Sequence, residues 1–337
     1  MYFRRVFVGL NLELRDLTSE EFVPAAARRL VERGIEIAVA QRGELHLCAV
    51  IDGLDLTQIP VSPQQITVFG GILSERLDSL AEEAREAGVE CETSLLGGVA
   101  WQELLQQADE WSADLIVIGA GSQHPSGFQN PEDQHDAPAS GRFSGNDDHS
   151  LTRRAGFAVA TSRLGPTALR LLRLAKCPVL VERPEASDDE GEPPHVLLAD
   201  DLSDGSGERL MAIVGSGLWR DAKCWLTHIV EPDRWPEAWQ GGISTDDLAR
   251  RQAARVESAR LKLHEHLAPT DHRTMSYGIL THVADGEFSA TLRRLIDEWQ
   301  INLLICGSGS QMDAVLPHVS CSVLCFSSPD AYVRTMG

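Results

Sequence analysis

The chain contains a long internal repeat, and this feature restricts its fold more than any other. Segment 109–123 reads DEWSADLIVIGAGSQ, and segment 297–311 reads DEWQINLLICGSGSQ. The two segments align without gaps at an offset of 297 − 109 = 188, with eight of fifteen positions identical. The same offset pairs Gly98 with Gly286, so the similarity extends back through the preceding segment. The sequence therefore predicts a duplicated domain.

Both copies lie within an alternation of short apolar strands and amphipathic helices. In the first half we expect strands near 5–10, 44–51, 89–95, 115–118 and 178–181, with helices near 21–40, 65–87, 99–110 and 167–175. In the second half we expect strands near 195–199, 224–230, 273–280, 303–306 and 322–326, with helices near 207–218, 246–267 and 288–299 and a short helix near 313–318. This alternation is typical of an α/β fold with parallel strands and right-handed crossovers.

A length of 337 residues is long for one hydrophobic core. We predict a first α/β domain over residues 1–184, an acidic linker over 185–194, and a second, shortened α/β domain over 195–337. Residues 124–162 are rich in Gly, Pro, Ser, Asp and His, and they interrupt the first domain where a tight loop is expected. A long irregular segment of this kind is usually disordered or functional.

The charge balance excludes several classes of partner. Fifty acidic against thirty basic residues give a formal net charge of −20, which repels nucleic-acid phosphates and anionic lipid head groups. We expect neither a nucleic acid nor a membrane as partner. The seven cysteines are an odd number without metal-ligand spacing, and the sequence shows no signal or membrane-spanning stretch, which predicts reduced thiols and a cytoplasmic location.

Glycine loops follow the fourth strand of each half, where open α/β sheets bind ligands. The residues of these loops are Gly119, Gly121 and Ser122 in the first copy, and Gly307, Gly309 and Ser310 in the second. Such glycines either let backbone N–H groups approach phosphate oxygens or only make a tight turn, and the sequence leaves both readings open. Neither G-x-G-x-x-G at these loops nor a P-loop occurs, and we predict no catalytic residues.

Histidines offer no metal site in this reading. His264 and His266 are two residues apart, so they lie on different faces of a helix, and we expect both at the solvated surface. The histidines of the 124–162 segment share it with several Asp residues, and we interpret that segment as a flexible polar loop. We therefore predict no bound metal.

The chain resembles the universal stress protein family in its tandem, two-domain form. The segments that carry the resemblance are ADLIVIGAGS at 113–122, SRLGPTALRLLRLAKCPVLVER at 162–183, NLLICGSGS at 302–310 and VSCSVLCF at 319–326. The resemblance implies two tandem open parallel five-stranded sheets with helices on both faces, a fold like that of the adenine-nucleotide α-hydrolases. It also implies that the domains pack as an intramolecular pseudo-dimer through their fifth strands; a homodimer is the further possibility.

ATP-binding members of that family have an Asp after strand one and a G-x2-G-x9-G-[ST] loop after strand four. The matching positions here, which the resemblance makes the candidate nucleotide contacts, are Asn11, Gly119, Gly121, Ser122, Gly165, Thr167, Asp200, Gly307, Gly309 and Ser310, with Asp201 as the alternative to Asp200. The match is imperfect. Asn replaces the carboxylate in the first half, and Pro166 lacks a backbone donor where phosphate would need one. In the second half the loop is too short for the full motif.

From this resemblance we predict a non-enzymatic protein that acts as a stress-response or regulatory binding module with degenerate nucleotide sites. It requires no cofactor, and ATP is the candidate ligand. The first alternative is an ATP-binding sensor that uses domain one. The second is a purely structural protein that binds a protein partner, whose identity the sequence does not give, through the linker and the 124–162 segment.

Overall fold

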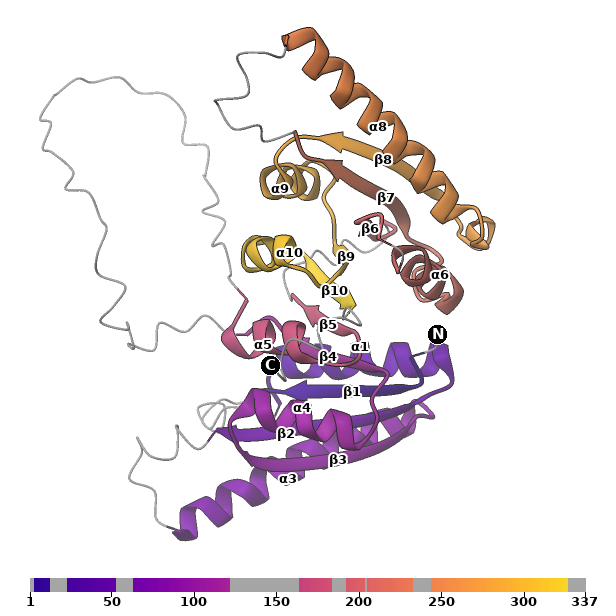
Figure 1. The fold of residues 1–337 in the computed structure, drawn as a ribbon. Helices are drawn as coiled ribbons and strands as arrows, with labels where there is room; N and C mark the ends of the chain where they lie inside the picture. Colours follow the sequence, from indigo (N-terminus) through magenta and orange to yellow (C-terminus); the bar gives the residue numbers. More distant parts are fainter. Residues whose placement is uncertain are drawn as a thin grey trace, which may run out of the picture.

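The computed structural model describes residues 3–12, 23–52, 63–121, 164–183, 192–203, 205–232 and 244–326. For residues 52, 63–69 and 310 it describes the backbone alone. The predicted 124–162 segment lies outside the described residues, as does most of the predicted linker, so the proposed domain limits remain predictions. Figure 1 shows the two halves of the chain stacked along one continuous sheet.

The first half contains five strands and the helices that connect them. Its strands are β1 (Arg5–Leu10), β2 (Glu44–Asp52), β3 (Glu90–Gly98), β4 (Leu115–Gly119) and β5 (Val179–Glu182). Its helices are α1 (Ala25–Gln41), α3 (Pro63–Glu86), α4 (Ala100–Glu110) and α5 (Pro166–Leu174). The strand order is β3-β2-β1-β4-β5, and all four neighbouring pairs are parallel.

The second half repeats this plan. Its strands are β6 (His195–Ala199), β7 (Lys223–Val230), β8 (Ile279–Asp285), β9 (Leu303–Gly307) and β10 (Ser322–Phe326). Its helices are α6 (Ser206–Ser216), α8 (Thr245–Leu267), α9 (Phe288–Glu298) and α10 (Ser310–Val315), with 3-10 turns at His272–Thr274 and Leu316–His318. The order β10-β9-β6-β7-β8 mirrors the first half, so the predicted α/β fold with a duplicated sheet is confirmed.

The two five-stranded sheets join edge to edge through their fifth strands. Strand β10 runs antiparallel to β5, with Val323 opposite Val181 and Leu324 opposite Leu180. The described strands therefore form one ten-stranded sheet. The sequences PVLVE and SVLCF supply this contact, as the pseudo-dimer prediction required.

Helices cover both faces of the sheet because strand residues alternate between two apolar layers. One layer packs under α1, α3, α6 and α8, and the other packs under α4, α5, α9 and α10. Each layer contains buried residues from both halves, so the core is continuous across the β5–β10 junction. Buried apolar strands of this kind are typical of parallel sheets.

The repeated DEW motif folds identically in the two halves. Trp111 and Trp299 end helices α4 and α9, and the next residues, Ser112 and Gln300, have φ of 56° and 50°. A positive φ is uncommon for residues other than glycine. Both copies accept this conformation because it turns the chain from the helix into the buried fourth strand.

One predicted strand is misplaced. Residues 273–280 were expected to form the third strand of the second half, but part of that range forms a 3-10 turn and β8 begins at Ile279. Gly278, with φ of +68°, turns the chain just before the strand, and Ile279 is the first residue to pair with β7, opposite Cys224. The first residues of the expected strand therefore form the 3-10 turn and the bend at Gly278.

Candidate functional site

Each half has a change of connection direction at its first strand, which is where doubly wound sheets bind ligands. Strand β1 lies between β2 and β4, and β6 lies between β7 and β9. The candidate residues from the sequence follow these strands at their carboxyl ends. The structure thus brings Asn11 to the same sheet edge as the first glycine loop, and Asp200 to the same edge as the second.

In domain one, the glycine loop meets the start of α5. Gly119 ends β4, and the next residue, Ala120, donates its N–H to the carbonyl of Glu182 at 3.0 Å. The N–H of Gly165 donates in turn to the carbonyl of Ala120 at 2.7 Å. A Cβ on Gly121, whose φ is +92°, would lie 3.3 Å from the Cα of Gly165, so glycine is needed here for conformation and close approach.

Helix α5 presents its N-terminus to this loop. Gly165 is the N-cap residue and makes no side-chain cap, Pro166 is the first helical residue, and Thr167 is half-buried behind it. Proline is well tolerated at that position because its missing N–H would have no intrahelical partner. It nevertheless removes one donor that a ligand could use. Asn11 is exposed after β1, and Ser122 lies outside the described residues.

Strand register identifies which acidic residue of domain two corresponds to Asn11. Val8 pairs with Val117 in domain one, and Leu198 pairs with Ile305 in domain two, where 117 and 305 are repeat partners at the offset of 188. Three residues further along are Asn11 and Asp201. Both are exposed, so Asp201, the alternative to Asp200, is the true counterpart of Asn11.

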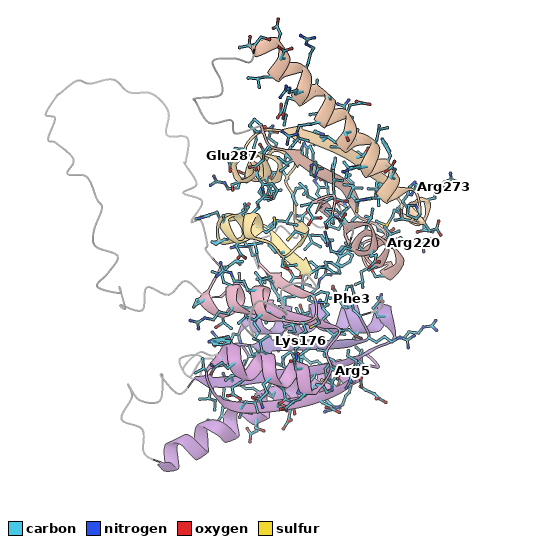
Figure 2. The ribbon with its side chains drawn as sticks, in the orientation of Figure 1. Phe3, Arg5, Lys176, Arg220, Arg273 and Glu287 are labelled. Atoms are coloured by element: carbon cyan, nitrogen blue, oxygen red, sulfur yellow. The ribbon has the colours of Figure 1, made fainter. Side chains whose placement is uncertain are left out.

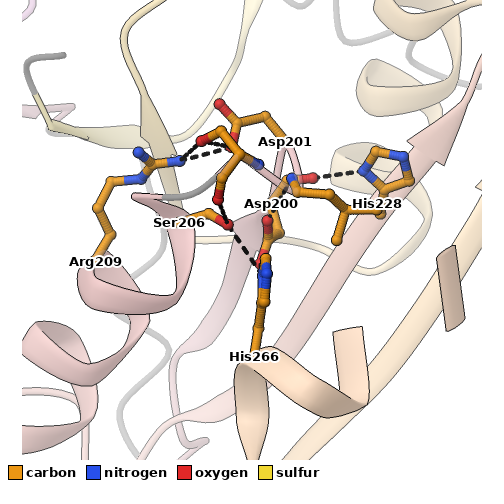
Figure 3. Close-up of polar contacts among 8 residues, drawn as sticks. Asp200, Asp201, Ser206, Arg209, His228 and His266 are labelled. Carbon is orange, nitrogen blue, oxygen red and sulfur yellow. Dashed lines mark hydrogen bonds and ion pairs between the residues drawn. The ribbon is translucent and has the colours of Figure 1, made fainter. Parts of the chain in front are cut away.

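Asp200 is instead a buried internal acceptor. Its side chain is 3% exposed, and its carboxylate accepts from the N–H of Leu202 at 2.7 Å and contacts His266 Nδ1 at 3.0 Å. The same His266 nitrogen lies 3.0 Å from Ser206 Oγ, which donates to the carbonyl of Ser203. In a catalytic relay the serine and the carboxylate contact different nitrogens of the imidazole ring. Ser206 and Asp200 contact the same nitrogen of His266, so this group is not such a relay. Figure 3 shows the group.

The surface prediction for His266 was wrong. His264 is exposed on α8, as expected, but His266 is half-buried and bound to Asp200. The prediction considered only the helix that contains the two histidines. The partner that buries His266 comes from the β6–α6 loop, 66 residues away in the sequence.

Asp201 is bound by two groups of its own domain (Figure 3). Its Oδ1 accepts from Arg209 Nη2 at 2.7 Å and from Ser203 Oγ at 2.7 Å, with the Ser203 N–H at 3.1 Å. Partial burial acts to raise the pKa of Asp201, but the hydrogen bonds from Ser203 and the charge of Arg209 outweigh it and lower that pKa. Asp201 is therefore held as a carboxylate within the chain.

Different side chains cover the glycine that ends the fourth strand in the two halves. A Cβ on Gly119 would lie 3.4 Å from Leu30 Cδ1 of α1, whereas a Cβ on Gly307 would lie 3.2 Å from Arg209 Cζ of α6. Beneath Arg209 is a pocket of about 20 Å³, lined also by Asp200 and Phe326. A volume of this size holds about one water molecule.

Carboxylates also occupy the start of α9 in domain two. Glu287, labelled in Figure 2, accepts from the N–H groups of Ser289 and Ala290 at 3.1 and 2.6 Å. Glu231 accepts from the N–H of Phe288 at 3.1 Å and from the side-chain amide of Gln311 at 3.2 Å.

The equivalent helix of domain one, α4, has Val99 as its N-cap and no side-chain cap. The two helix ends therefore differ in where their carboxylate comes from: α9 has it at the N-cap, Glu287, whereas α4 has Glu103 in its first turn.

The second glycine loop is short. Gly309 is exposed in extended conformation, and Ser310 begins α10, which has only six residues. The N–H of Ser308 donates to the carbonyl of Phe326 at 2.8 Å, the counterpart of the Ala120–Glu182 bond in domain one. The loops thus share their strand-side hydrogen bond, but only the first leads to a longer helix.

The described residues show no group of three or more His, Cys, Asp or Glu side chains that could hold a metal ion. The thiols within that part of the chain are buried or half-buried. Burial raises the pKa of Cys224 to about 12 and that of Cys321 to about 12. Thiols in such surroundings react slowly, because the thiolate is the reactive species.

The residues that sequence analysis missed are Arg209, Glu231 and Glu287. Each belongs to an element other than the glycine loops, and each acts through a contact that no motif encodes. A weak signal existed for Glu287 alone, since an acidic residue directly before an amphipathic helix is a capping position.

The fold is that of a tandem doubly wound α/β protein with the same strand order in each half. Residues 23–128 match the model of the universal stress protein family. The predicted resemblance to that family is therefore confirmed for this segment. No curated protein matches the chain.

Solved structures extend the likeness in fold to the whole chain. A functionally unknown protein from Pseudomonas aeruginosa is 17% identical, with a TM-score of 0.61, and the alignment covers 98% of this chain and 95% of that protein. A universal stress protein from Archaeoglobus fulgidus is 15% identical, with a TM-score of 0.55 and 98% coverage of both chains. At these identities the comparison shows a shared fold. No helix in the described part of the chain is long and apolar enough to cross a membrane.

Proposed function

We propose that this protein is a non-enzymatic, universal-stress-type regulatory binding module with degenerate nucleotide sites, in which domain one provides the edge that a ligand approaches. The observation that carries the proposal is the difference between Asn11 and Asp201. Asn11 is an uncharged, exposed residue beside a glycine loop, whereas its counterpart Asp201 is a carboxylate that is paired with Arg209. A cytoplasmic location and a protein partner remain part of this proposal.

The proposal that the protein is not an enzyme rests on the side-chain geometry, since the Ser206–His266–Asp200 contacts converge on one nitrogen.

The experiment is thermal unfolding with and without millimolar Mg-ATP, on the wild type and on an Asn11→Asp/Pro166→Ser variant. Asp restores a carboxylate, and Ser restores a backbone donor at the first position of α5. We expect no shift for the wild type and a higher midpoint for the variant, because ligand that binds only the native state stabilises it. Equal, unshifted midpoints in both proteins would overturn the assignment of a residual site to domain one.

The second candidate function is an ATP-binding sensor that uses domain one, and the open Gly119–Gly121 loop at the start of α5 favours it. A midpoint that rises with Mg-ATP in the wild type itself selects this candidate over the degenerate module. Phosphate release from ATP, measured in the same samples, tests the non-enzymatic assignment. We expect release at the rate of the protein-free control.

A further inference from the structure

Arg209 occupies the position in domain two that an external ligand would approach. Its guanidinium lies over Gly307 and above the small pocket, while its backbone belongs to α6 on the other side of the crevice. The side chain is 19% exposed, and Asp201 holds it through the 2.7 Å ion pair. Asp201 follows β6 and Arg209 belongs to α6, and the guanidinium of Arg209 lies over Gly307 at the end of β9.

We propose that the Arg209–Asp201 pair is a built-in latch that keeps the ligand edge of domain two closed, so that this half is regulated from within the chain. The inference goes beyond the proposed function, because it concerns how domain two is shut and not what domain one binds. It makes Arg209 a positioning residue for the 307–309 loop.

Several contacts strengthen the latch. Asp201 is held independently of Arg209, because Ser203 donates to the same oxygen through both its N–H and its hydroxyl group. Leu202, between them, has φ of 55°, and its N–H is bound by Asp200. The acceptor is thus preorganised, and little side-chain entropy remains to be lost at the carboxylate.

Domain one provides the comparison that isolates the effect of charge. Among the described residues there, Leu30 Cδ1 is the atom nearest to a Cβ on Gly119, and the position equivalent to Asp201 is the uncharged Asn11. An apolar cover beside an uncharged residue moves aside without breaking an ion pair, whereas Arg209, 19% exposed, has to leave Asp201, 56% exposed, before it can move. The latch is therefore specific to domain two.

Amide hydrogen exchange of the full chain tests the latch. The reporter is Ser308, whose N–H donates to Phe326, and the internal control is the equivalent N–H of Ala120 in domain one. The variants are Arg209→Met, which keeps the aliphatic stem over Gly307 and removes the charge, Asp201→Asn, and the pair combined. Arg220→Ala, at an exposed Arg that bonds the Thr274 carbonyl, is the matched surface control.

We expect exchange at Ser308 to accelerate about threefold in each single variant and no further in the double variant, because both changes break one interaction. Ala120 and the Arg220→Ala protein should keep wild-type exchange. Unchanged exchange at Ser308 in Arg209→Met, additive effects of the two changes, or equal acceleration at Ala120 would each overturn the latch. The domain-one assignment is independent of these results, since it rests on the response of the Asn11→Asp/Pro166→Ser variant to Mg-ATP.

Discussion

The two halves of this chain have the same sheet order but treat the ligand edge of that sheet differently. In domain one the edge has an exposed Asn11, an uncapped α4 and a glycine loop covered by Leu30. In domain two Arg209 and Glu287 fill the equivalent positions from within the chain. After a duplication, the two copies can therefore line the same edge of the sheet with different side chains.

The junction between the halves holds this pair together, and it gives the largest expected effect. Leu324 is 1% exposed in β10 and faces Leu180 of β5, so Leu324→Ala should lower the free energy of unfolding by about 3 kcal/mol. If the ten-stranded sheet is one cooperative unit, amide exchange should show the loss in both halves. Loss of protection confined to 195–326 would show that the halves unfold independently. Leu280→Ala, at a residue 60% exposed, is the control and should change stability by less than about 0.5 kcal/mol.

The second largest difference between the halves is expected at the paired glycines Gly98 and Gly286. Both have positive φ, 152° and 146°, so alanine is strained at either position by about 1–2 kcal/mol. A Cβ on Gly98 would lie 2.5 Å from the end of the flexible Glu103 side chain, whereas a Cβ on Gly286 would lie 2.5 Å from the hydroxyl of buried, β-branched Thr291. We expect Gly286→Ala to cost about 1 kcal/mol more than Gly98→Ala in urea unfolding. Equal costs would contradict this account of the two sites.

The equivalent helices α4 and α9 differ at the N-cap, which is Val99 in α4 and Glu287 in α9. Glu287→Ala should lower stability by about 1 kcal/mol, because it leaves two helix N–H groups without their acceptor. Val99→Ser should instead raise stability by about 0.5 kcal/mol, because it adds an acceptor where the structure has no side-chain cap. Urea unfolding of both variants provides the measurement. A neutral or destabilising Val99→Ser would mean that the start of α4 is already satisfied.

The smallest effect concerns pH. His46 and His282 each make an edge-on contact with the repeated tryptophan of their half, at 5.2 Å from Trp111 and 4.9 Å from Trp299. Burial lowers the pKa of His46, which Glu92 partly offsets and Arg5 reinforces; burial, Arg294 and Arg260 lower the pKa of His282.

A histidine with a lowered pKa in the folded state binds its proton more readily in the unfolded state. Stability is therefore complete above the unfolded value of about pH 6.5 and is lost as pH falls below it. His46→Gln should flatten the acid side of the stability–pH curve more than His282→Gln, since His46 is the more buried. His264→Gln, at an exposed position, is the control. A wild-type slope in His46→Gln would disprove the assignment.

Much of the fold could be predicted because the repeat and the apolar periodicity are local signals. Strands β1, β6 and β10 begin and end where the sequence placed them. The strand expected at 273–280 began too early, because a 3-10 turn and Gly278 precede β8. The offset of 188 maps β3, Glu90–Gly98, onto 278–286, so the repeat contained the correct position.

The candidate site was less predictable, because motifs identify the loops but not what fills them. The glycines and Asn11 follow strands of known order, so their position at the carboxyl edge could be derived. Arg209 and His266 reach the edge from helices, and their roles depend on contacts with Asp201 and Asp200 that only the folded chain creates. Sequence alone could not choose between the two aspartates; strand register did.

The most direct test of the central claim maps amide exchange in the Asn11→Asp/Pro166→Ser variant with and without millimolar Mg-ATP. The account predicts new protection only in domain one, at residues 119–121 and 165–169, with residues 200–209 and 307–309 unchanged. Protection at 200–209 or 307–309 would contradict it, because domain two would then accept a ligand despite Arg209. Protection in neither half would contradict it as well, because domain one would have no usable edge even with its carboxylate and donor restored.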